Sequence, residues 1–320
     1  MSYAKWIRSH AGTQKVFLVY ASMILVDDNG RFLLQRLTDC GRWGLPGDVL
    51  QLNEDIQQCA RRSLLKQTAL SVGKLQLVGI HTHPHFDAGY AYGDYMQPYI
   101  ICLTGRLTGD KKRPERKETT MQAFVSLAEA ENLPVLPWCR AMLAAASAKR
   151  LPAFTPPFSS EIVQDQIASV RQFVGNERII GVGATTAVQR EDGRFLMIQR
   201  ADNGAWVFPA GYSNLGENAA QTAVRETWEE TGYHIEPTQV LAIYSSSHYH
   251  HTFPNGDQVK NVGTLFLSRL LGGTPRLQES EVRDLAWLTR TELLQRTTPT
   301  LRELHKGALH SLDNGGCFID

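Results

Sequence analysis

The chain has 320 residues, of which 42% are hydrophobic and 20% are charged, and its formal net charge is +1. This length exceeds that of one ordinary domain and suits two domains of about 150 residues, each able to build an apolar core. A chain so close to neutral lacks the clustered basic surface typical of proteins that bind nucleic acid, and its one basic run, 110–118, includes acidic residues.

The five cysteines are odd in number and widely spaced, so neither a zinc site nor a disulfide framework is predicted. The N-terminal segment lacks the apolar core of a signal peptide. No stretch reaches the roughly 18 apolar residues that indicate a membrane span. We therefore expect a cytoplasmic protein with reduced thiols and no membrane partner.

The two halves of the sequence are repeats of one another. A shift of 163 positions places Gly-Arg-Phe-Leu at 30–33 on the same four letters at 193–196, and Trp43 on Trp206. One offset that holds from the first helix to the late strands indicates an internal duplication. We predict one domain at 1–150 and a second at 161–320. A proline-rich linker at 151–160 separates them.

The same elements are expected in the same order in each copy. A short helix (3–11; 161–174) precedes an apolar strand, and an X-Gly turn leads into a second strand. A Trp–Pro loop follows, and then a longer helix (54–67; 217–231). Further strands and a terminal helix complete each copy. This order predicts an α/β unit made twice.

The longer helix of the second copy carries an acidic face. Glu226, Glu229 and Glu230 stand at i, i+3 and i+4, so their carboxylates lie on one side of the helix. Like charges at that spacing destabilise a helix, whereas Mg²⁺ prefers oxygen ligands of this kind. A solvated acidic surface is the alternative. The acids, however, belong to a longer pattern of fixed spacing with Gly211, Glu217, Arg225 and Gly232.

The segment Gly211–Tyr233 resembles the Nudix box, G-x5-E-x7-R-E-U-x-E-E-x-G-U with U apolar. Every invariant letter is present, and Thr227 departs where an aliphatic residue is usual. The resemblance implies two tandem α/β/α sandwiches with mixed sheets. It also implies hydrolysis of the pyrophosphate bond in a nucleoside diphosphate linked to another moiety, with nucleotide-sugar or ADP-ribose types favoured over nucleoside triphosphates.

The resemblance further implies Mg²⁺ or Mn²⁺ held by Glu226, Glu229, Glu230 and the carbonyl of Gly211. Arg225 and Glu217 would hold these ligands in place. A general base from outside the box is expected at Glu281 or Glu279, with Glu281 preferred. The candidate substrate contacts are Arg200, Tyr244 and Tyr249, and the two tyrosines could stack on a base.

The first copy keeps Glu54 and Arg62 but has lost the acids. Ser63, Lys66 and Gln67 replace the three ligands, and Asp48 replaces the first glycine. A divalent ion cannot be held by that set, so the first copy is predicted to keep the fold without the chemistry. The ammonium of Lys66 could take the place of the cation beside Glu54.

Other readings stay open. His81, His83 and His85 alternate along the chain and could bind Zn²⁺, although a substrate-facing loop is preferred. The protein could instead sense a nucleotide with a non-catalytic first domain, or that domain could act as a scaffold. We expect a monomer in which the two copies pair as a pseudo-twofold dimer, with a true homodimer as the alternative.

Overall fold

The computed structural model describes residues 1–38, 40–82, 96–108, 121–148, 152–157 and 163–320. It divides into two compact units. Unit 1 comprises Met1–Ala153 with Val170–Gly175, and unit 2 comprises Phe154–Ser169 with Asn176–Asp320. The predicted domain limits and the predicted pseudo-twofold pairing of the copies stay predictions.

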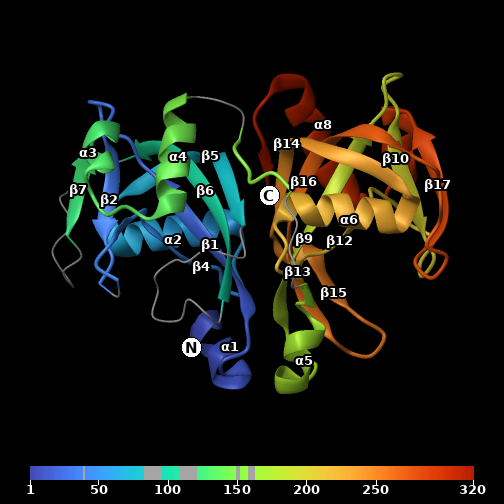
Figure 1. Ribbon diagram of the computed structural model, residues 1–320, viewed down its shortest axis with the longest axis horizontal. Coiled ribbons are helices and arrows are strands. Elements are labelled where there is room, and N and C mark those ends of the chain that lie inside the picture. The colour runs from blue at the N-terminus through green and yellow to red at the C-terminus, as the bar shows by residue number, and fades with distance from the viewer. Residues whose placement is uncertain (39, 83–95, 109–120, 149–151, 158–162) are drawn as a thin grey trace. The chain divides into compact units, whose positions relative to one another are not determined.

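Unit 1 begins with a capped helix and a long buried strand, and Figure 1 shows its strands between helices. Its elements are α1 (Tyr3–Ala11), β1 (Val16–Ile24), β2 (Phe32–Arg36), β3 (Trp43–Gly44), β4 (Gly47–Val49), α2 (Ile56–Thr68), β5 (Ser71–Thr82), β6 (Met96–Thr108), β7 (Gln122–Val125), α3 (Leu127–Glu131) and α4 (Pro137–Ala148).

The second copy repeats this order with added short strands (Figure 1). Its elements are β8 (Gln164–Asp165), α5 (Ala168–Val174), β9 (Ile179–Gln189), β10 (Phe195–Arg200), β11 (Trp206–Val207), β12 (Ala210–Tyr212), β13 (Asn214–Leu215), α6 (Ala219–Thr231), β14 (Tyr233–Tyr244), η2 (Ser247–Tyr249), β15 (His250–Thr252), β16 (Gln258–Gly273), β17 (Val282–Leu288), α7 (Arg290–Arg296), α8 (Pro299–Asn314) and β18 (Phe318–Ile319).

The sheets are mixed, as predicted. In unit 1, β1 lies parallel to β6 and antiparallel to β4, and β6 is antiparallel to β5. In unit 2, β9 lies parallel to β16 and antiparallel to β12, and β16 is antiparallel to β14. Even the register is duplicated. Val16 pairs with Met96 and Ile179 pairs with Val259, so both partners are displaced by the same 163 positions.

Unit 2 is layered, because neighbouring residues of one strand enter different cores. Ala187 and Phe195 belong to a cluster that contains Leu304 of α8. Val188 and Leu196 belong to another, against which Val224 of α6 packs. Since successive side chains of a strand point to opposite faces, α6 and α8 cover opposite faces of the sheet. Figure 1 shows α6 lying across the strands. The α/β/α prediction is confirmed.

The first helix of the second copy is shorter than expected. The prediction was 161–174, but α5 covers only Ala168–Val174 and β8 precedes it. The carboxylate of Asp165 accepts hydrogen bonds from the amides of Ile167 and Ala168, at 2.7 and 3.0 Å. The Asp165 side chain thus bonds amides that a longer helix would bond to its own carbonyls. This capping determines where α5 starts.

Some expectations concern segments that lie outside the described residues. These are His83 and His85 of the alternating histidines and the basic run at 110–118. All five cysteines are free thiols. In the described segments, every helix is too short or too polar to cross a membrane.

Candidate active site

The acidic helix of the second copy has well-formed ends. Asn218 caps its start, with its side-chain oxygen accepting a hydrogen bond from the amide of Gln221 at 2.8 Å. Gly232 ends it in the left-handed region at φ 75°, and the Gly232 amide donates to the carbonyl of Trp228. Thr227, where the box departs from its usual residue, is buried, and its hydroxyl donates to the carbonyl of Ala223 at 2.7 Å. The helix therefore accommodates the polar residue.

Arg225 forms hydrogen bonds to three of the glutamates of the box. Its Nη1 lies 2.8 Å from both Glu226 and Glu229, and its Nε donates to Glu217 at 2.6 Å. Its Nη2 also donates to Glu217 at 3.0 Å and to the carbonyl of Tyr212 at 2.8 Å. Burial lowers the pKa of Arg225, but the hydrogen bond to Glu217 and the nearby carboxylate charges outweigh burial and raise that pKa. Arg225 is thus a fixed cation that orients three carboxylates.

Gly211 lies directly against Glu226. A Cβ built on Gly211 would lie 2.1 Å from the Glu226 carboxyl carbon. Only glycine leaves room for that carboxylate to lie against β12. The requirement for glycine in the box is therefore steric at this position.

The β9–β12 ladder decides which backbone groups face the acids. Pro209 and Ser213 bond to β9 through their carbonyl and amide, so by alternation the carbonyl of Gly211 is directed at β9 as well. Ala210 points the other way, and its amide donates to Glu230 at 3.0 Å. The carbonyl of Ala210 faces the same side as its amide, toward the carboxylates.

Burial raises the pKa values of the two most buried ligand carboxylates. Burial raises the pKa of Glu226 to about 7, with Arg225 opposing the rise and Glu229 and Glu217 adding to it. Glu230 is 3% exposed, and burial together with the charge of Glu226 raises its pKa well above the ordinary value. Carboxylates crowded in this way gain from a nearby cation.

Glu281 lies within electrostatic reach of the site. Its charge contributes to the raised pKa of both Glu230 and Arg200. Its carbonyl accepts a hydrogen bond from the amide of Ala201 at 2.8 Å, which ties the start of β17 to the end of β10. Arg200 also forms an ion pair with Asp202 at 2.8 Å. Glu279, the other candidate base, is exposed, as is Glu281.

The two predicted substrate tyrosines lie together on the α8 side of the sheet. Their ring centroids are 5.1 Å apart, and both pack against the cluster that contains Phe208 and Leu304. The hydroxyl of Tyr244 lies 3.1 Å from that of Thr185. The acids come from α6 on the opposite face and meet β12 at the sheet edge, so the tyrosines are separated from them by the sheet.

Unit 1 replaces the same network by a rearranged one. Arg62 donates to Glu54 at 2.7 and 2.8 Å, as Arg225 does to Glu217. Its Nη1 donates to Asp48 at 2.8 Å, in place of Glu226. Ser63, at the position of Glu226, turns back to the carbonyl of Ala60. The carboxylate that pairs with the arginine comes from α6 in unit 2 and from β4 in unit 1. Asp48 has room on β4 because Ser63 on α2 is short.

Gln67, at the position of Glu230, occupies the backbone groups of Gly47 that correspond to those of Ala210. Its oxygen accepts from the amide of Gly47 at 3.1 Å, and its Nε2 donates to the carbonyl of Gly47 at 2.8 Å. A carboxylate cannot donate, so Glu230 leaves the equivalent Ala210 carbonyl available. Lys66 is exposed and, within the described residues, has no ion pair. The expectation that the Lys66 ammonium takes the place of the cation beside Glu54 is wrong, because Glu54 pairs with Arg62.

The donor set of unit 2 fits a hard divalent cation. The described residues contain no ready-made cluster of three His, Cys, Asp or Glu side chains arranged around one point. Arg225 holds Glu226 and Glu229, while Ala210 holds Glu230. The chemistry nevertheless matches: one helix face carries three carboxylates, two of them with raised pKa values, and Glu230 lies against Ala210, whose carbonyl faces the same side.

Sequence reasoning missed the backbone partners Tyr212, Ala210 and Gly47. The available signal was the comparison of the two copies. Gly211 and Glu226 change together into Asp48 and Ser63, as a contact pair would.

Known proteins resemble this chain in both halves. The family model described as NUDIX domain matches residues 16–146 and 179–308. A MutT-like protein from Streptomyces ambofaciens is 36% identical over 115 residues, which cover 36% of this chain and 68% of that protein. Nucleoside diphosphate-linked moiety X motif 6 from Xenopus laevis is 40% identical over 144 residues, which cover 43% of this chain and 64% of that protein.

Among solved structures, an ADP-ribose pyrophosphatase from Streptococcus suis 89-1591 aligns with a TM-score of 0.36 at 21% identity, over 44% of this chain and 100% of its own. The two family matches together span most of the 320 residues. The chain therefore belongs to the NUDIX domain family of hydrolases and carries the domain twice.

Proposed function

We propose that unit 2 hydrolyses the pyrophosphate bond of a nucleoside diphosphate linked to another moiety, with Mg²⁺ or Mn²⁺ as cofactor. The observation that carries this proposal is the Arg225-centred network, in which Glu217, Glu226 and Glu229 all lie within 3.0 Å of one guanidinium. The name of the Xenopus relative refers to a nucleoside diphosphate-linked moiety. A Bacillus subtilis relative, 34% identical over 65 residues, is named a putative ADP-ribose pyrophosphatase.

Glu226, Glu229 and Glu230 would hold the metal. We assign the backbone ligand to the carbonyl of Ala210 in preference to that of Gly211, because the ladder turns the latter toward β9. Once bound, the divalent ion supplies an acidified water and neutralises charge on the phosphates. Arg225 and Glu217 are positioning residues, since they reach the reacting atoms only through the three ligands.

The remaining roles follow from position. Glu281, which is electrostatically coupled to Glu230, would remove the proton from the attacking water. Arg200 lies within reach of the same acids, and a guanidinium there would contact a phosphate oxygen. Tyr244 and Tyr249 have no assigned role here, because they lie on the α8 face of the sheet and pack against the core there. Unit 1 takes no part in this chemistry, because Ser63 and Gln67 are not metal ligands of this kind.

The proposal is tested with the full chain. ADP-ribose, UDP-glucose and dGTP are each incubated with Mg²⁺ or with EDTA, and the nucleoside monophosphate formed is measured by anion-exchange chromatography. We expect turnover of ADP-ribose or UDP-glucose with Mg²⁺ and none with EDTA.

Paired substitutions locate the activity. Glu229→Gln removes a metal ligand and should lower kcat by about 10²-fold or more. Lys66→Gln, at the same position in unit 1, is the matched control and should leave kcat unchanged. Equal rates for the Glu229→Gln variant and the wild type would contradict the assignment, as would metal-independent turnover.

A further inference from the structure

The segment that follows β16 passes directly over the C-terminal end of α6. Between Gly273, where β16 ends, and Val282, where β17 begins, the chain forms neither helix nor strand. The amide of Arg276 donates to the carbonyl of Thr231, the last residue of α6, at 2.9 Å. The segment is therefore bonded to the same helix that carries the three candidate metal ligands.

Gly232 makes this close approach possible. A Cβ built on Gly232 would lie 2.3 Å from the carbonyl oxygen of Thr274 and 3.0 Å from the amide nitrogen of Arg276. The left-handed turn alone does not exclude a side chain, since Ala69 ends α2 of unit 1 at φ 57°. What excludes a side chain at 232 is the segment that lies over it.

A side-chain contact holds the segment at the same point. The guanidinium of Arg276 lies over the indole of Trp228, 4.9 Å from the ring centroid. Tryptophan offers a cation the most favourable aromatic face. Trp228 is 41% exposed and Arg276 is exposed as well. Because both side chains lie at the surface, this contact can be removed without opening a core.

The other end of the segment carries Glu281. The carbonyl of Gln278 accepts hydrogen bonds from the amides of Glu281 and Val282, both at 2.8 Å, and Nε2 of Gln278 donates to the Glu281 carboxylate at 3.3 Å. Val282 then pairs with Arg200 at the end of β10. Since Glu281 is exposed, its position depends on these attachments rather than on packing. One attachment is β10, and the other is the segment that Arg276 holds on α6.

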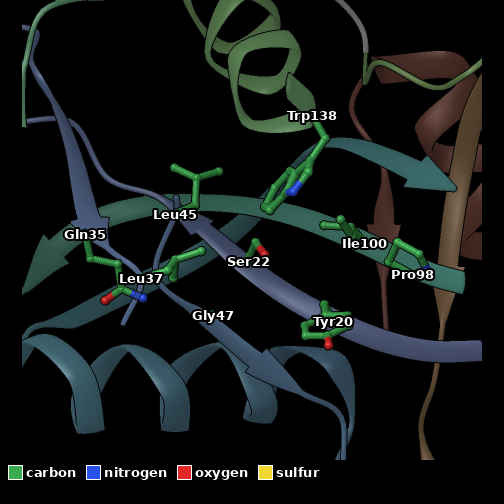
Figure 2. Close-up of a pocket in the computed structure, with 9 residues that line it drawn as sticks. All are labelled: Tyr20, Ser22, Gln35, Leu37, Leu45, Gly47, Pro98, Ile100 and Trp138. Carbon is green, nitrogen blue, oxygen red and sulfur yellow. The ribbon is translucent and has the colours of Figure 1, made fainter. Parts of the chain in front are cut away.

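Unit 1 lacks two of the residues that surround this segment in unit 2. The counterpart of Trp228 is Leu65, which offers no aromatic face to a cation. The counterpart of Arg200 is Leu37, which lines the cavity of unit 1 drawn in Figure 2. The corresponding segment itself, 110–118, lies outside the described residues. The copy that lost its three acids has thus also lost the tryptophan that holds the segment.

We propose that Arg276 is a positioning residue for the hydrolysis. By holding segment 274–281 on α6, it sets the distance between Glu281 and the attacking water. The inference rests on the proposed function, in which Glu281 is the base. A base must lie within hydrogen-bond reach of the proton that it removes, so a small displacement of the segment lowers the rate. Substrate and metal affinity should not change, because Arg276 contributes to neither.

The test measures turnover of ADP-ribose and UDP-glucose by the full chain with Mg²⁺. Arg276→Ala removes the guanidinium, and Trp228→Leu copies unit 1. Each should lower kcat about two- to fivefold and leave KM and the calorimetric affinity for Mn²⁺ unchanged. The double variant should lose no more than either single variant, because both changes remove one contact.

Hydrogen–deuterium exchange in EDTA gives a readout that does not depend on activity. The amides of Arg276, Glu281 and Val282 are hydrogen-bonded, so they should exchange slowly in the wild type. In Arg276→Ala the peptide 276–282 should exchange faster, while the amides of α6 should keep their wild-type rates.

A double-mutant cycle separates positioning from a general structural effect. Glu281→Gln removes the base and should lower kcat about 10²-fold. Arg276→Ala should have no further effect in that background, because it acts only through Glu281. Arg190→Ala is the matched control. It removes the same kind of contact in the same unit, with the guanidinium 5.0 Å from the ring centroid of Trp287, and should leave kcat unchanged.

The inference is overturned if Arg276→Ala keeps the wild-type kcat or the wild-type exchange rates, or if it lowers kcat equally with and without Glu281. A raised KM at unchanged kcat overturns it too, since Arg276 would then bind substrate. In these cases Glu229→Gln still abolishes turnover, and the proposed function stands. If the wild type shows no Mg²⁺-dependent turnover, or if Glu281→Gln keeps the wild-type kcat, the proposed function fails and the inference fails with it.

Discussion

Glu230→Gln should make the protein more stable and less active. In unit 1 the same position holds Gln67, whose amide bonds to both the amide and the carbonyl of Gly47. A glutamine at 230 can copy this arrangement with Ala210, where the glutamate now makes one bond at 3.0 Å. The variant gains one hydrogen bond and loses a buried acid whose pKa is well raised, so the free energy of unfolding should rise by about 1 kcal/mol.

The same change removes a predicted metal ligand and satisfies the backbone carbonyl beside it. A loss of about 10²-fold in kcat corresponds to about 2.7 kcal/mol of transition-state stabilisation. Turnover of ADP-ribose with Mg²⁺ measures the loss. Urea unfolding in EDTA measures stability without a contribution from bound metal.

The mirror variant is Gln67→Glu, which buries a carboxylate and leaves the carbonyl of Gly47 without its donor. It should lower the free energy of unfolding by about 1–3 kcal/mol. The reasoning is refuted if Glu230→Gln unfolds more easily than the wild type in EDTA, or if it keeps more than about a tenth of the wild-type turnover.

Three further changes test other parts of the structure. Ala69 ends α2 in the left-handed region at φ 57°, where a residue with a Cβ is strained. Ala69→Gly should therefore raise the free energy of unfolding, measured by urea titration, by about 0.5–1 kcal/mol. An unchanged free energy of unfolding would show that this strain is absent. Gly211→Asp should lower both the free energy of unfolding and the turnover, because the new side chain would overlap Glu226. Adding Glu226→Ser should restore the stability but not the activity, since Asp48 and Ser63 coexist in this way in unit 1. If the double-mutant cycle shows no such rescue, the exchange of Glu226 for Asp48 is contradicted. His305 is 1% exposed and burial lowers its pKa to about 3, so the folded chain keeps it neutral while the unfolded chain protonates it below about pH 6.5. Stability is therefore lost as pH falls from about 6.5 toward 3, by about 2 kcal/mol between pH 7 and 5, and His305→Gln should lack that part of the loss.

The sequence alone determined the features that depend on neighbouring residues. The i, i+3, i+4 spacing places Glu226, Glu229 and Glu230 on one helix face wherever that helix lies. Likewise, the 163-residue offset predicted the duplicated fold, and the register of β1 and β9 repeats it.

Only the tertiary structure decided what the helix faces meet. Residues 210 and 211 are adjacent, yet the ladder with β9 turns one carbonyl toward the acids and the other away. The exchange of Glu226 for Asp48 depends on a contact between helix and strand, so it is visible only when both copies are folded. The side of the sheet occupied by Tyr244 and the coupling of Glu281 to Glu230 likewise come from packing between distant segments. Local spacing fixes which side chains share a surface, whereas burial and strand pairing determine which of them meet a partner.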